Sequence, residues 1–164
     1  MVTFETLYEA FFDKIEKDKD FFSYNDVIVE DALKIAKMRS KRYLQEALST
    51  ISLKCTPDKC GKNFADADDV QEILNYDLTY IELDMIASVM YEKYLFREFS
   101  KLKTQANRFI VKDFNVFSPA NERNSFTAMY QAIKNDNDVL IDNYLSIDHS
   151  TGNTLALDYS TIED

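Results

Sequence analysis

The spacing of apolar residues along the chain predicts four amphipathic helices. In the first, expected over residues 3–17, the apolar residues recur every three or four positions and so share one helical face: Phe4, Leu7, Tyr8, Phe11, Phe12 and Ile15. The polar run 18–20 ends this helix, and we expect Phe21 and Phe22 to anchor the connection in the core. A second, longer helix is expected over residues 25–51, with Asn25 as its N-cap.

The third and fourth predicted helices begin at recognisable caps. Thr79 and Glu82 form a capping box, in which each side chain accepts a hydrogen bond from the backbone N–H of the other residue. This box predicts a helix over residues 80–103. For the last helix, expected over residues 119–145, Ser118 can serve as the cap and Pro119 takes the first helical position, where its missing N–H costs nothing.

Apolar residues cover well over half of the circumference of the third helix. Such a helix is either central to a bundle or shares a surface with another subunit. The residues that we assign to this core or subunit interface are Met85, Val89, Met90, Phe96 and Phe99.

Two segments lack helical periodicity. Residues 52–77 are predicted to be irregular, with a short helical turn across 68–74, and residues 146–164 are predicted to form an extended arm that bends at Gly152. An extended arm could add a strand to another protein's sheet or lie in a groove. The apolar residues that we expect to dock are Ile147, Leu155, Leu157, Tyr159 and Ile162. We therefore expect a helical domain over 1–145 and an acidic C-terminal arm over 146–164.

The composition supports a helical protein. The 164 residues suit one domain, and two glycines and two prolines are too few for the many turns of a sandwich or an α/β enzyme. We predict an all-α fold, a four-helix-type bundle with the irregular 52–77 segment and the extended arm. Charges interrupt every apolar run and no signal pattern opens the chain, so we expect a soluble protein that does not enter a membrane.

The net charge of −10 argues against a general nucleic-acid binder. Seven acids and no Lys or Arg lie between residues 135 and 164, so this end carries −7 and leaves −3 for the rest. It could be an interaction arm or a solvated tail. The second helix has a basic middle, with five cations between Lys34 and Arg42. That surface could be a solvated face or the rim of a contact with an acidic partner.

Residues that carry chemistry are few. The chain has no glycine-rich phosphate loop, and its one histidine, His149, lies in the polar C-terminal segment. Cys55 and Cys60 are interpreted as reduced thiols in a loop, because a zinc site needs about four ligands. We therefore expect no enzyme activity, no catalytic residue, and no cofactor or metal.

The order of the segments resembles the small neck proteins of tailed bacteriophages, the head-to-tail connector or adaptor family of Firmicute phages and prophages. The resemblance covers roughly residues 3–145. The segments that carry it are the opening Thr3-Phe4-Glu5-Thr6-Leu7-Tyr8-Glu9, the capping-box helix from Asp77 to Ala87, and Lys112-Asp113-Phe114 followed by Ser118-Pro119-Ala120-Asn121. Tyr94 stands where that family is expected to have a tryptophan, and the C-terminal segment matches no pattern of the family.

The resemblance implies a structural role in the virion neck. Subunits of that family are helical and form a ring, usually of about twelve copies, beneath the portal protein. The ring extends the DNA channel, through which DNA passes without specific binding, and docks a head-completion (stopper) or tail-terminator protein. The chain would be made in the cytoplasm of the host bacterium. The alternatives are a cellular helical protein-interaction or regulatory module and, less favoured, an unrecognised enzyme.

Overall fold

The protein is mostly helical, and its helices pack against one another. The computed structural model describes residues 1–15, 19–22, 24, 27–108, 119–148, 152, 154 and 155. The helices are α1 (Phe4–Lys14), α2 (Lys19–Phe22), α3 (Val29–Lys54), α4 (Pro57–Cys60), α5 (Tyr80–Arg108) and α6 (Pro119–Leu145). The strands are β1 (Val2–Thr3), β2 (Ala67–Asp68) and β3 (Ile73–Leu74).

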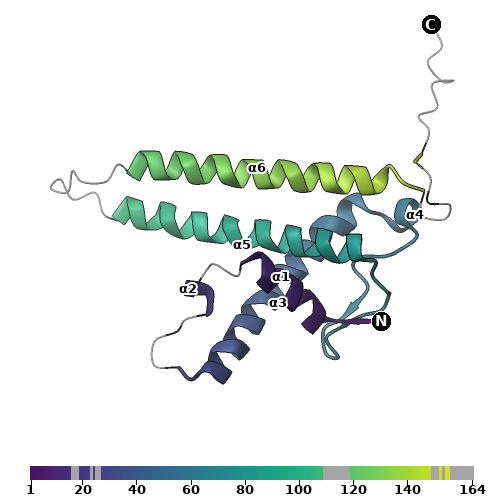
Figure 1. The fold of residues 1–164 in the computed structure, drawn as a ribbon, viewed down its shortest axis with the longest axis horizontal. Coiled ribbons are helices and arrows are strands. Elements are labelled where there is room, and N and C mark those ends of the chain that lie inside the picture. The colour runs from purple at the N-terminus through teal and green to yellow at the C-terminus, as the bar shows by residue number, and fades with distance from the viewer. Residues whose placement is uncertain are drawn as a thin grey trace, which may run out of the picture.

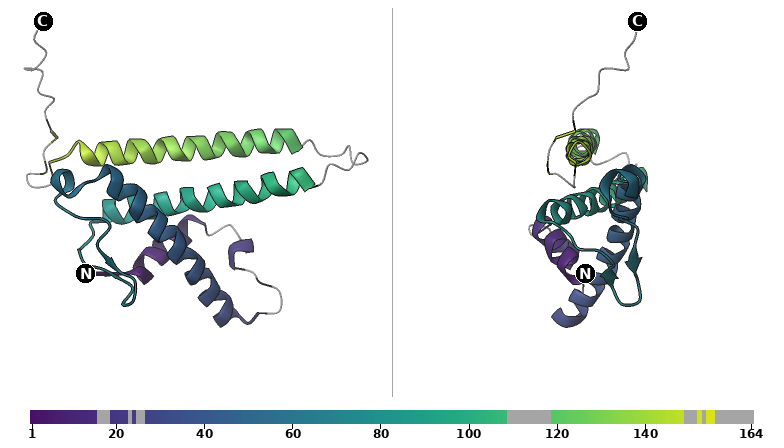
Figure 2. Two further views of the ribbon diagram at one scale, coloured as in Figure 1. Left: turned by 180° about the vertical axis from the view of Figure 1, so that it is seen from behind. Right: turned by 90° about the vertical axis from the view of Figure 1, so that its right-hand side faces the viewer.

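Helix α5 lies at the centre of the molecule. Helix α6 runs antiparallel beside it, while α1 and α3 pack against its other sides, with α3 crossing obliquely (Figures 1 and 2). Asn137 of α6 is buried in the α5–α6 seam, where its Nδ2 donates to the Glu92 carboxylate at 3.0 Å and to the Ser88 carbonyl at 3.2 Å. This paired polar contact fixes the register of the two long helices, because sliding one of them would leave a buried amide without partners.

The core on the other side of α5 is rich in aromatic rings. Phe11 of α1 and Tyr94 of α5 meet Phe21 of α2 edge-to-face, with ring centroids 5.8 and 5.5 Å away. Tyr43 of α3 completes the group, 6.0 Å from Tyr94. Such pairs contribute about 1 kcal/mol each beyond the burial of their area. The prediction that Phe21 anchors the connection after α1 is confirmed, since the side chain is fully buried.

The helix boundaries follow the sequence prediction most closely at α6, whose bounds are the predicted 119–145. Helix α1 ends earlier than predicted, α3 continues to Lys54, and α5 continues to Arg108. Ile28 holds the N-cap position of α3. The prediction that Asn25 caps this helix is therefore wrong, because α3 begins four residues later, at Val29. The predicted cap Ser118 lies outside the described residues.

Part of the segment predicted to be irregular forms a small antiparallel sheet. The strand order is β1-β3-β2, and Leu74 of β3 lies opposite both Val2 and Ala67. The predicted helical turn across 68–74 is therefore wrong, because these residues form the β2–β3 hairpin. The Asp68 carboxylate accepts hydrogen bonds from the backbone N–H groups of Val70 and Gln71, at 2.8 and 3.0 Å. This local bonding favours a turn over a helix.

Candidate functional site

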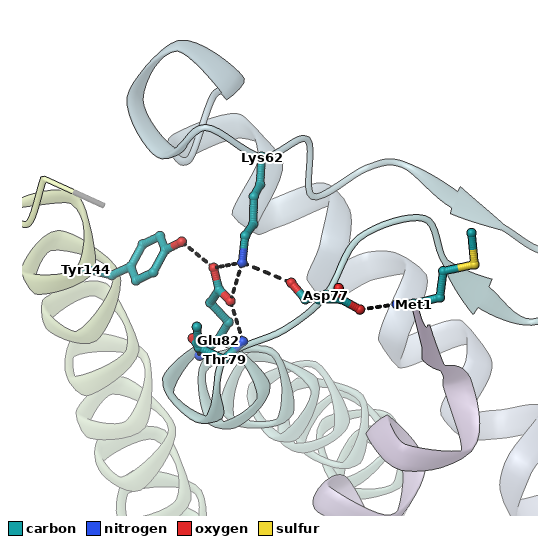
Figure 3. Close-up of polar contacts among 6 residues, drawn as sticks. All are labelled: Met1, Lys62, Asp77, Thr79, Glu82 and Tyr144. Carbon is teal, nitrogen blue, oxygen red and sulfur yellow. Dashed lines mark hydrogen bonds and ion pairs between the residues drawn. The ribbon is translucent and has the colours of Figure 1, made fainter. Parts of the chain in front are cut away.

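A buried carboxylate, Glu82, joins the first turn of α5 to the base of the C-terminal segment (Figure 3). The predicted capping box is confirmed. The Thr79 backbone N–H donates to Glu82 Oε2 at 2.6 Å, and the Glu82 backbone N–H donates to Thr79 Oγ1 at 3.3 Å. Because the box aims the carboxylate back over the helix N-terminus, Glu82 faces inward with only 2% of its surface exposed.

Lys62 supplies the opposite charge. Its Nζ lies 2.7 Å from each carboxylate oxygen of Glu82 and also donates to the Asp77 carbonyl at 2.9 Å. Lys62 follows Gly61, which has a positive φ of 67° and ends the short helix α4. Glycine adopts that conformation without strain, so the chain can turn here and direct Lys62 toward α5. The Asp77 carboxylate in turn pairs with the N-terminal amine of Met1.

Tyr144 brings the end of α6 into the same cluster. Its hydroxyl donates to Glu82 Oε1 at 2.6 Å, in a buried contact between residues 62 positions apart. Tyr144 lies in the last turn of α6, immediately before the C-terminal segment. We call Lys62, Thr79, Glu82 and Tyr144 the anchor cluster, because together they tie the start of α5 and the end of α6 to the loop after α4.

The anchor cluster holds Glu82 in its charged form. Burial alone would raise the pKa of Glu82, but the hydrogen bonds from Lys62, Thr79 and Tyr144 outweigh that effect and leave the pKa below its ordinary value. Burial and the hydrogen bond to Glu82 raise the pKa of Tyr144. A carboxylate that stays charged at neutral pH and already accepts hydrogen bonds from Lys62, Thr79 and Tyr144 is suited to fixing helices in place. It is poorly suited to moving protons, which requires a pKa near the working pH.

The C-terminal segment turns back directly after the anchor cluster. The Leu155 backbone N–H donates to the Ser146 carbonyl at 2.7 Å, and Ile147 pairs with Thr154 in an antiparallel bridge. Gly152 has a positive φ of 73°, which confirms the predicted bend there. The described part of the segment therefore pairs back on itself through these contacts, whereas the sequence predicted an extended arm with a bend at Gly152. Ile147 is half-buried and Leu155 is exposed, whereas Leu157, Tyr159 and Ile162 lie outside the described residues.

The five residues assigned to a core or subunit interface divide into two groups. Met85, Val89 and Met90 are buried inside the subunit, where no other chain can reach them. Phe99 is half-buried and stacks on Phe126 of α6, with ring centroids 5.6 Å apart. Phe96 is exposed and contacts Tyr130. The apolar circumference of α5 is thus mostly used within one subunit, by α1, α3 and α6.

Phe96 lies at the edge of a shallow groove of about 650 Å³ between α3, α5 and α6. Its lining is mixed in charge and polarity: Arg42, Gln45, Glu46, Ser49, Thr50, Lys93, Phe96 and Tyr130. Sequence reasoning could not predict this groove, because its walls come from three helices whose relative positions depend on packing.

The two cysteines are free thiols, as predicted, but both belong to the core, and Cys60 lies in a short helix rather than in a loop. Cys55 follows α3 and Cys60 ends α4, and both side chains are buried. Burial raises the pKa of the Cys55 thiol to about 12 and also raises that of Cys60. Buried thiols that stay protonated are poor nucleophiles and poor metal ligands. Within the described residues, no three His, Cys, Asp or Glu side chains are placed to hold a metal ion.

Comparisons with known proteins add no relative: no protein family, curated protein or solved structure gives a significant match to this chain. In the part of the chain that the structure describes, no helix combines the length and the apolar character needed to span a membrane.

Proposed function

We propose that this chain is a structural protein of a bacteriophage neck, which forms a ring beneath the portal, extends the DNA channel and docks the next neck or tail protein. The observation that carries the proposal is the ordered run of motifs in the sequence, above all the capping-box helix that begins near Asp77. As part of the same proposal, we interpret α1, α3, α5 and α6 as the helices of a four-helix-type bundle.

The anchor cluster suits a subunit that must hold a protruding segment under load. It bonds the last turn of α6 to the first turn of α5, so the C-terminal segment leaves the domain from a fixed base. The segment has acids and no Lys or Arg, which suits docking on basic groups of a portal protein. In this proposal, residues 146–164 order on the portal, with Ile147 and Leu155 as the first apolar contacts.

The acidic surface suits a channel component. A net charge of −10 repels the phosphates of DNA, so DNA could slide through the ring without being retained.

Co-sedimentation with the cognate portal protein tests the proposal. The full chain should travel with the portal at a fixed ratio of adaptor to portal subunits, whereas a chain ending at Leu145 should not. If the full chain and portal never associate at any concentration tried, the neck proposal fails. A cellular interaction module then becomes the better interpretation.

A further inference from the structure

The shallow groove between α3, α5 and α6, which we call the three-helix groove, contains apolar surface that the described residues leave uncovered. Phe96 is 51% exposed at its edge, beside the half-buried ring of Tyr130, and the two ring centroids lie 5.8 Å apart. The α3 wall adds the amide of Gln45 and the hydroxyls of Ser49 and Thr50. Two rings beside a row of hydrogen-bonding groups suit an extended peptide, which presents both side chains and backbone groups.

Most charges in the lining are already compensated within the subunit. Glu46 pairs with Arg97, and Lys93 lies 3.3 Å from the buried carboxylate of Glu92. Arg42 differs from these residues, because it is exposed and forms no ion pair with any residue that the structure describes. The charge that the groove leaves without a partner is therefore the positive charge of Arg42.

The last part of the chain carries the complementary groups. Residues 156–164, which follow Leu155, contain three acids and no Lys or Arg. Ile162 is directly followed by Glu163 and Asp164. An apolar side chain next to two carboxylates fits a groove in which two exposed rings lie near an unpaired cation.

The order of the lining residues agrees with the direction from which this segment comes. The ion pair between Lys54 and Asp138, at 2.7 Å, joins α3 to α6 near the base of the C-terminal segment. From there the two helices diverge toward their N-terminal ends (Figures 1 and 2). Along α3 from Lys54, Thr50 is the first lining residue and Arg42 the last. A segment that enters from the base of the arm therefore meets the polar wall first and Arg42 at the far end.

The segment is also long enough to reach the rings. The Leu155 backbone N–H donates to the Ser146 carbonyl at 2.7 Å, which fixes Leu155 beside the end of α6. Tyr130 lies sixteen residues before Ser146, which is about 24 Å along the helix at about 1.5 Å per residue. The nine residues 156–164 span about 30 Å when extended, at about 3.3 Å per residue. Because segment and groove belong to one chain, the local concentration is in the millimolar range, which favours this segment over that of a second copy.

We infer that residues 156–164 dock in the three-helix groove of their own chain, with Ile162 against Phe96 and Tyr130 and the following acids near Arg42. This contact does not depend on the neck proposal. Where the same segment also docks on a portal, groove and portal compete for it. A free subunit then keeps the end of its arm on its own surface until a portal displaces it.

Disulfide cross-linking in the full chain tests the contact. Ser49→Cys places a thiol on the exposed α3 wall of the groove, and Ser160→Cys places one in the segment. We call the chain with both substitutions the groove pair. Treated with oxidised glutathione, it should form an intramolecular disulfide, which mass spectrometry of a digest identifies. The native thiols should not compete, because Cys55 and Cys60 are buried and stay protonated.

Ala132→Cys combined with Ser160→Cys is the matched control. Ala132 is exposed and lies two residues from Tyr130, on the opposite side of α6 and nearer to the end of that helix. A segment without a docking site would reach it at least as readily as the groove. The disulfide of this control should therefore form at least tenfold more slowly than that of the groove pair.

A charge reversal tests the polar end of the contact. Arg42→Glu in the groove pair should slow cross-linking at least tenfold, because it replaces the unpaired cation with a charge that repels the acids of the segment. Lys34→Glu makes the same change two turns earlier in α3, outside the groove, and should leave the rate of cross-linking unchanged.

Three results would overturn the inference: equal cross-linking rates for the groove pair and its control, equal effects of Arg42→Glu and Lys34→Glu, or a disulfide that joins two copies of the chain. The last result would assign the groove to the segment of a second copy. A portal-binding assay separates this inference from the neck proposal. Fast cross-linking of the groove pair without portal binding by the parent would support the self-contact and sink the neck proposal. Portal binding by the parent with slow cross-linking of the groove pair would do the reverse.

Discussion

At the scale of single residues, Glu82 does the most to position other groups. Its carboxylate caps α5, pairs with Lys62 and accepts from Tyr144, so three segments distant in sequence meet at one side chain. The cost of burying this charge is offset only while all of these donors remain. The sequence predicted one partner of Glu82, Thr79, which lies three residues earlier in the same capping box. Lys62 and Tyr144 lie 20 and 62 residues from Glu82, and no local pattern connects them.

We expect Glu82→Gln to destabilise the protein by about 3 kcal/mol at neutral pH, because it leaves Lys62 without its partner. The pKa of Glu82 is lowered on folding, so its contribution is fully present above the unfolded carboxyl pKa of about 4.3 and is lost as the pH falls through the folded value. The stability difference between parent and variant should therefore shrink in acid. Urea unfolding across this range measures it, with the exposed Glu9→Gln as control. A difference that is independent of pH would contradict the charged role of Glu82.

Met90 is a second residue with a clear expectation. Its side chain projects from α5 into the core and is fully buried. Met90→Asp should therefore lower the free energy of unfolding by about 4 kcal/mol or more and prevent stable folding. Phe99→Asp should be milder, because Phe99 is half-buried and loses mainly its stacking on Phe126. Thermal unfolding followed by circular dichroism measures which of the two variants is less stable. Met38→Asp, at an exposed position of α3, should unfold like the parent. A folded Met90→Asp protein would show that the core is misplaced.

At the scale of elements, the sequence predicted those parts whose signals are local. Pro119 and a long apolar period were enough to give the bounds of α6, and Thr79 with Glu82 gave the start of α5. The sheet could not be predicted in this way. Each strand has two residues, too few to show alternation, and β1 pairs with β3 some 70 residues later. The burial of the two cysteines was missed because it depends on how α4 packs.

The C-terminal segment is the element on which portal docking depends in our proposal. A chain ending at Leu145 should keep its helical circular dichroism and nearly its melting temperature, because the anchor cluster and the α5–α6 seam remain. It should lose portal binding. A chain ending at Leu155 keeps the hydrogen bond between Leu155 and Ser146. Comparing its portal affinity with that of the full chain therefore measures what residues 156–164 contribute to portal binding. Portal binding by the shorter chain at the parent's affinity would place the docking surface on the helices instead.

At the scale of the whole molecule, charge is the dominant property. The net charge of −10 should keep the assembled protein from binding DNA, because the negative charge repels phosphates and most cations in the basic middle of α3 are already paired with acids of the same chain. We expect affinity for duplex DNA weaker than about 10⁻⁴ M, the weak end of nonspecific binding proteins. Fluorescence anisotropy with a labelled duplex at low and moderate salt measures this. Tight binding that weakens steeply with salt would be incompatible with a passive channel.

The most direct test of the neck proposal is negative-stain imaging of the full chain mixed with its cognate portal, with the chain ending at Leu145 as the matched control. The account predicts a ring of added density on one face of the portal, coaxial with its channel, in the first mixture and bare portals in the second. Portals without added density in both mixtures, at concentrations where the chain is folded and in excess, would contradict the account.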